Sequence, residues 1–147
     1  MRKRSIRIAV LCVLMGAGLF SFAEEPLDQL IQRANAAPVH QQAGLYMEIA
    51  ERQLQTADRL YGAGQSAAAK AAVAEVVTYS EKATDASAHS ASRLKQTEIA
   101  LRKMAMKLRD IRRSVSFEDQ KPVEEAADRL EKMRTDLLAR MFNQGGK

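Results

Sequence analysis

The chain has 147 residues, with 23 lysines and arginines, 18 aspartates and glutamates, and a formal net charge of +5. Its one cysteine is Cys12, so disulfides and thiolate zinc sites are excluded for the chain beyond that position. Four of the 23 basic residues and none of the acidic ones lie in residues 1–23, which leaves 19 against 18 beyond them. Global basicity therefore does not indicate nucleic-acid binding.

Residues 1–23 have the three parts of a secretory signal peptide. A basic start precedes an apolar run over residues 8–20, and Ser21 and Ala23 are the small residues that a signal peptidase requires. We expect cleavage after Ala23 and a periplasmic or secreted protein of bacterial type. The alternative is an uncleaved N-terminal membrane anchor, but the apolar run is shorter than the ~20 residues that span a bilayer.

Residues 24–142 are predicted to form one helical domain, and residues 143–147 a flexible tail. Apolar residues recur at spacings of three and four in five segments, which is typical of amphipathic helices. Gly62 and Gly64 are expected to end the second helix through a left-handed cap, with Ser66 as the N-cap of the third. Pro122 is expected in the first turn of the last helix. The predicted helices cover residues 27–36, 39–61, 67–86, 91–115 and 122–142.

The fourth predicted helix has an apolar stripe with the 4-3 spacing of a heptad repeat, in which Leu94, Leu101 and Leu108 lie seven residues apart. The last helix has a matching stripe that includes Leu130 and Leu137. Because the connection between these helices is short, we expect them to pair antiparallel. The stripes could also be covered by another copy of the chain, so a homo-oligomer remains an alternative.

The segment from about residue 45 to 80 carries small residues, an aromatic residue, a turn glycine and a later alanine at characteristic offsets. These are Ala57, Leu60, Tyr61, Gly64, Ala69, Val73 and Val76. The segment resembles the helix–turn–helix unit of a tetratricopeptide repeat, although no second copy follows at a 34-residue period. The resemblance implies a protein-binding helical surface without catalysis. The expected fold is therefore all-α: two antiparallel αα-hairpins in a four-helix bundle or a tetratricopeptide-like array, plus a short N-terminal helix.

No group of residues predicts catalysis, and we expect no enzyme activity, no catalytic residue and no cofactor. His40 and His89 are far apart and lack neighbouring ligands, so no metal site is expected. Acidic residues at the start of the last helix, including Glu118 and Asp119, are explained by the helix dipole. The methionines follow apolar stripes, where they fill gaps in a core, except Met106.

The fourth predicted helix is strongly basic, with eight lysines and arginines against Glu98 and Asp110. The simplest interpretation is a solvated face that the acidic first half of the chain neutralises. The functional interpretation is an anion-binding face. Nucleic acid is disfavoured as its ligand because no aromatic residue accompanies the arginines. The candidate interaction face consists of Arg102, Lys103, Arg109, Arg112 and Arg113.

The predicted function is a non-catalytic, exported interaction or scaffold protein that binds an unidentified protein of the cell envelope through a helical surface. The alternative is an envelope-associated protein that binds anionic lipid or polymer through the basic helix over residues 91–115.

Overall fold

The computed structural model describes residues 24–88 and 90–145, so the predicted signal peptide and its cleavage site lie outside the described residues. The described chain is all-helical and contains no strand, which confirms the predicted fold class. Of its helices, none is long and apolar enough to cross a membrane. The helices are α1 (Leu27–Ala36), α2 (Val39–Gly62), α3 (Ser66–Ser87), α4 (Ala91–Ser114) and α5 (Phe117–Gly145).

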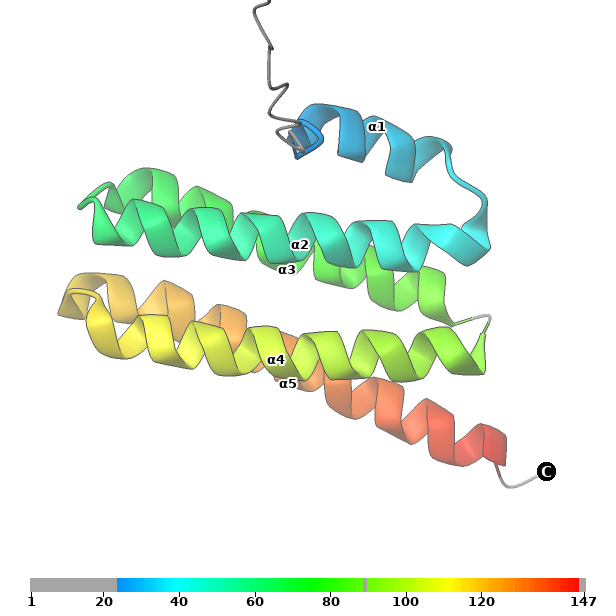
Figure 1. The fold of residues 1–147 in the computed structure, drawn as a ribbon. Helices are drawn as coiled ribbons and strands as arrows, with labels where there is room; N and C mark the ends of the chain where they lie inside the picture. The colour runs from blue at the N-terminus through cyan, green and yellow to red at the C-terminus, as the bar shows by residue number, and fades with distance from the viewer. Residues whose placement is uncertain (1–23, 89, 146–147) are drawn as a thin grey trace, which may run out of the picture.

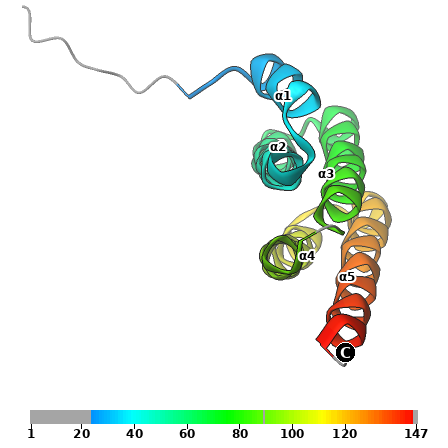
Figure 2. The ribbon, with the colours of Figure 1, turned by 90° about the vertical axis from the view of Figure 1, so that its right-hand side faces the viewer.

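The four long helices form two antiparallel hairpins, α2–α3 and α4–α5, that pack against each other (Figure 1). Helix α2 contacts α4, and α3 contacts both α4 and α5, whereas no contact joins α2 to α5 within the described chain. Seen from the end, α2 and α3 form an upper layer and α4 and α5 a lower layer (Figure 2). Helix α1 packs on α2. None of the other described helices therefore covers the lower side of α4 and α5.

The turn between α2 and α3 has the predicted glycine cap. Gly64 has a φ of +73°, the left-handed conformation that favours glycine. The amide of Gln65 donates to the Leu60 carbonyl at 2.9 Å, and the amide of Gly64 donates to the Tyr61 carbonyl at 3.0 Å. These two bonds satisfy carbonyls at the end of α2 and let the chain reverse within a few residues.

The predicted heptad stripes of α4 and α5 form the centre of the core. In α4, Leu94, Leu101 and Leu108 are fully buried, with Thr97, Met104 and Ile111 nearly so. In α5, the stripe residues Val123, Ala126, Leu130, Met133 and Leu137 are buried. The 4-3 spacing thus places the buried residues of each helix on one side, where they join the core shared by both hairpins.

Tyr46 and Tyr79 add an aromatic contact between α2 and α3, and the sequence interpretation did not include Tyr46 in the core. The ring centroids lie 6.2 Å apart, and the Lys82 ammonium is 4.9 Å from the centre of the Tyr79 ring. The Tyr46 hydroxyl donates to Asn35 at 3.1 Å, which ties the end of α1 to α2.

The prediction that the last helix begins at Pro122 was wrong, because α5 begins at Phe117 and has Pro122 inside it. The amide of Asp119 donates to the Ser116 carbonyl at 2.9 Å, and the Ser116 hydroxyl donates to the Asp119 carboxylate at 2.9 Å. This capping arrangement starts the helix one and a half turns before the proline. Pro122 has no amide hydrogen to donate to the Glu118 carbonyl, and its ring crowds that carbonyl, so the helix lacks one hydrogen bond there.

The predicted N-cap role of Ser66 was also wrong. Helix α3 has no side-chain cap at its start, and the Ser66 hydroxyl instead donates to the Asp119 carboxylate at 2.7 Å, across the junction between the hairpins. The other helix ends lie within a few residues of the expected ones. The α5 helix continues to Gly145, so the predicted tail boundary at 143 falls within it.

Candidate interaction face on helix α4

The structure divides the five predicted interaction residues among three sides of α4. Arg102, Arg109 and Arg113 are exposed on the lower side, away from the other hairpin. Lys103 lines a groove between α2 and α4. Arg112 lies toward α5, where it forms an ion pair with Glu124 and lines one small pocket together with Arg109 and Arg113. The five residues therefore do not form one face.

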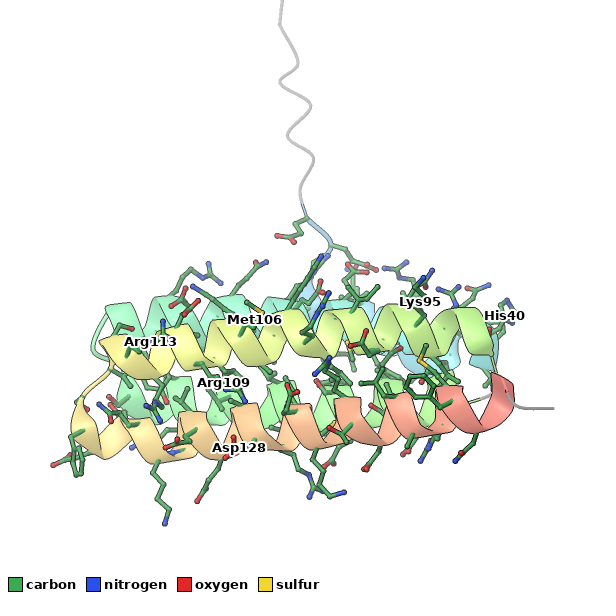
Figure 3. The ribbon with its side chains drawn as sticks, turned by 90° about the horizontal axis from the view of Figure 1, so that it is seen from below. His40, Lys95, Met106, Arg109, Arg113 and Asp128 are labelled. Carbon is green, nitrogen blue, oxygen red and sulfur yellow. The ribbon has the colours of Figure 1, made fainter. Side chains whose placement is uncertain are left out.

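Three of them belong to a stripe that the sequence interpretation did not identify. We call it the basic stripe, and all of its side chains are exposed or half-buried. Its members follow a second 4-3 spacing on the side opposite to the buried leucines. Figure 3 shows Lys95, Met106 and Arg113 along this side of α4. The basic stripe consists of Lys95, Ile99, Arg102, Met106, Arg109 and Arg113.

The cations of the basic stripe are only partly matched by carboxylates. The Arg113 guanidinium lies 3.0 Å from Asp110, and the Arg109 guanidinium lies 4.0 Å from Asp128 on α5. No carboxylate of the described chain lies within 4.0 Å of the charged groups of Lys95 or Arg102. The stripe also carries the Met106 side chain, which is 60% exposed. It therefore combines positive charge with uncovered apolar surface.

The groove between α2 and α4 has buried Leu54 and Met104 at its base. On its walls, the Lys107 ammonium lies 2.6 Å from the Asp58 carboxylate, which joins the two hairpins. Lys103 is the one wall lysine without a carboxylate at this distance in the described structure. The groove is thus closed partly by an ion pair of the fold, and two other cations on its walls, Lys103 and Arg59, have no carboxylate within 4.0 Å in the described structure.

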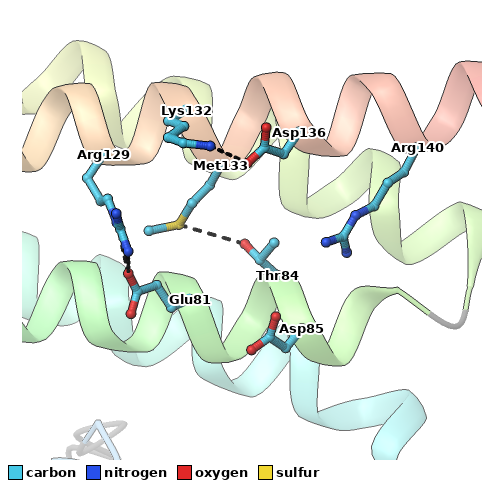
Figure 4. A pocket seen from close by; sticks show the side chains of 8 residues that line it. All are labelled: Glu81, Thr84, Asp85, Arg129, Lys132, Met133, Asp136 and Arg140. Atoms are coloured by element: carbon cyan, nitrogen blue, oxygen red, sulfur yellow. Dashed lines mark hydrogen bonds and ion pairs between the residues drawn. The ribbon is translucent and has the colours of Figure 1, made fainter.

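A second cleft lies between α3 and α5 (Figure 4). Thr84 and Met133 are buried at its base, and six charged side chains surround them. The Arg129 guanidinium donates to Glu81 at 2.8 and 3.0 Å, and the Lys132 ammonium lies 3.0 Å from Asp136. Three cations and three carboxylates line this cleft, so its charges balance and it does not favour a charged ligand of either sign.

Asp119 is buried where the hairpins meet, so it is more than an acidic residue in a first helical turn. The Lys70 ammonium lies 2.7 Å from its carboxylate, and the hydroxyls of Ser66 and Ser116 donate to the same group. The Lys70 contact, followed by these two hydrogen bonds, lowers the pKa of Asp119 from 3.8 to about 2. The group therefore links α3 to the start of α5 and has a structural role.

The described residues contain no group of three or more histidine, cysteine, aspartate or glutamate side chains that could hold a metal ion. His40 is exposed and its ring lies 3.2 Å from the side chain of Gln41. His89 lies outside the described residues. Met104, Met133 and Met47 are buried in the core, and Met106 is exposed.

The signal for the basic stripe is present in the sequence, because residues 95, 99, 102, 106, 109 and 113 repeat the 4-3 spacing of the leucine stripe on the opposite side. It was missed because its four cationic members are mixed with two apolar ones, Ile99 and Met106, so that neither charge nor hydropathy alone reveals the pattern. Grouping residues by charge selected Lys103 and Arg112, which point elsewhere.

Comparison with known proteins gives no relative: the chain matches no family model, no curated protein and no solved structure at a significant level. No family match therefore supports the resemblance of residues 45–80 to a tetratricopeptide unit. The hairpins are also longer than that unit, since α2 begins at Val39 and α4 begins 52 residues later, at Ala91.

Proposed function

We propose that this protein is a non-catalytic helical interaction protein of the cell envelope, which binds another protein through the basic stripe of α4. The supporting observation is that Met106 is exposed among cations that the fold leaves partly unmatched. Exposed apolar side chains next to charged ones are common in protein interfaces, where the apolar atoms are buried and the charges determine orientation.

A helical surface of this kind presents a rigid row of side chains to a partner. The stripe lies on a helix whose other side is fixed in the core by fully buried leucines, so its side chains are held at constant spacing. Preorganised surfaces lose less conformational entropy on binding than flexible ones. The groove between α2 and α4 and the cleft between α3 and α5 are lined instead by ion pairs that connect the two hairpins.

The second candidate is binding of anionic lipid or polymer by the same stripe. It is favoured by Lys95 and Arg102, because neither has a carboxylate partner in the described structure. It is opposed by the exposed carboxylates of Asp128 and Glu124 on α5, which lie beside the stripe and would repel an anionic surface.

The test replaces Met106 with a photo-crosslinking amino acid in the bacterium that produces the protein. We expect protein adducts at this position and none when the same amino acid replaces Ala71, which is exposed on α3. Charge reversal by Arg102→Glu should reduce the adducts at least fivefold, since it reverses a charge beside the crosslinker. Absence of protein adducts, together with flotation of the protein on anionic vesicles at low salt, would contradict the proposal and favour the lipid-binding alternative.

A further inference from the structure

We infer that the lower side of α4 and α5 binds a second copy of this chain, with the basic stripe of one copy packed on α5 of the other. This inference rests on the proposed function and names the partner of the same surface. It is carried by a second stripe, which lies on α5 directly beside the basic stripe.

We call this second stripe the acidic stripe, and it also follows a 4-3 spacing over five helical turns. It begins with carboxylates and ends with apolar side chains, and none of its members is buried. Phe142 at its end is 79% exposed. The acidic stripe consists of Glu124, Asp128, Glu131, Thr135, Leu138 and Phe142.

The two stripes lie on one face and in the same register. Figure 3 shows Arg109 between the ribbons of α4 and α5 and Asp128 on α5, and their charged groups are 4.0 Å apart. Because the helices are antiparallel, residues equally far in sequence from the turn lie at the same level. The remaining pairs at equal levels are Arg113 with Glu124, Met106 with Glu131, Arg102 with Thr135, Ile99 with Leu138, and Lys95 with Phe142.

This register makes the face complementary to itself. A two-fold axis that runs along the face, between α4 and α5 and parallel to them, places α4 of each copy over α5 of the other. Arg109 then faces Asp128 of the second copy, and Ile99 faces Leu138 of the second copy. Lys95 meets the ring of Phe142, a cation–π arrangement. Thus a residue of the basic stripe faces, in the second copy, the same residue of the acidic stripe that lies beside it in its own chain.

Other arrangements of the same face are less favourable. An axis along α4 would place α4 on α4 and bring Arg102 and Arg109 against the same arginines of the second copy, which costs free energy. An anionic bilayer would meet the exposed carboxylates of Glu124 and Asp128 together with the cations. Only the pairing of α4 with α5 matches charge to opposite charge along the face.

The size of the face suits a dimer of modest affinity. The basic stripe runs from Lys95 to Arg113, which is about 27 Å of helix, and two helices side by side are about 20 Å wide. These dimensions give a footprint on the order of 500 Å² per copy. We therefore expect association that depends on protein concentration, without the extensive apolar burial of an obligate dimer. The charged pairs should make it weaker at high salt.

The test is sedimentation of the chain from Glu24 onward, over concentrations from about 1 to about 500 µM. We expect a reversible shift from monomer to dimer mass. Arg109→Asp and Asp128→Arg should each raise the dissociation constant at least tenfold. An equimolar mixture of the two variants should dimerise again, because each interface pair then joins opposite charges. Arg59→Asp on α2 is the matched control and should leave the dissociation constant unchanged.

A monomeric wild-type chain over the whole concentration range would overturn the inference, and so would a dimer that Arg109→Asp does not weaken. Failure of the mixture to recover would equally exclude the α4-on-α5 arrangement. The proposed function can be judged separately: a chain that is monomeric but still gives charge-dependent adducts to other proteins at position 106 binds a different partner. Loss of those adducts as well would contradict both.

Discussion

Helix α4 carries two stripes with the same 4-3 spacing and opposite chemistry. The leucine stripe, which includes Leu94, Leu101 and Leu108, is fully buried against the other helices. The basic stripe on the opposite side keeps Arg102 and Met106 in solvent. The 4-3 spacing therefore indicates that residues share one side of the helix. Whether that side is buried within the chain follows from the residue types, since the leucines are buried and the cations are exposed. Two neighbouring residues, Leu101 and Arg102, therefore have very different roles.

The largest expected effect comes from placing the same side chain on each stripe. Leu101→Asp puts an unpaired carboxylate at a fully buried position, and we expect it to cost more than about 4 kcal/mol and to unfold the protein. Arg102→Asp, one residue further, should change stability by less than about 0.5 kcal/mol because that position is exposed. Circular dichroism melting curves measure both. A normal melting curve for Leu101→Asp would show that the leucine stripe is misassigned.

A smaller effect is expected at the junction of the two hairpins. Asp119 has a pKa lowered to about 2, so its ionised form stabilises the folded state. This stabilisation is present above the unfolded-state pKa near 3.8 and is lost as the pH falls from about 5 to about 2. Asp119→Asn should destabilise the protein at pH 7 and flatten the pH dependence of the unfolding free energy in this range, as urea unfolding at several pH values would show.

Glu125→Gln, an exposed change nearby, is the control. If the slope below pH 5 is unchanged in Asp119→Asn, another carboxylate is responsible.

The sequence was sufficient for the elements that rest on periodicity. Five helices, the pairing of α4 with α5 and the glycine cap at Gly64 all follow from local patterns. The errors arose where residues distant in sequence meet. Asp119 is bonded by Ser66 and Lys70, 53 and 49 residues earlier, so its burial had no local signal. The early start of α5 did have one, because Ser116 and Asp119 lie three residues apart, but Pro122 was given more weight.

The candidate site illustrates the same limit. The charge of α4 was evident in the sequence, but which side of the helix each cation occupies depends on where the other helices pack. Lys103 and Arg112 were grouped with the exposed arginines, and contacts with α2 and α5 direct them elsewhere. The position of the acidic stripe beside the basic stripe required the antiparallel register, which Arg109 and Asp128 define.

Met104 and Met106 provide the most direct measurement of the central claim, that the two sides of α4 are covered by different molecules. Met104 is 2% exposed on the leucine stripe, and Met106 is 60% exposed on the basic stripe. Oxidation by dilute peroxide, followed by mass spectrometry, reports the exposure of each thioether. We predict that Met104 is protected at every protein concentration, whereas Met106 is oxidised rapidly in dilute protein and at least fivefold more slowly once the chain is concentrated enough to associate. An equal oxidation rate of Met106 at all concentrations, or rapid oxidation of Met104, would contradict the account.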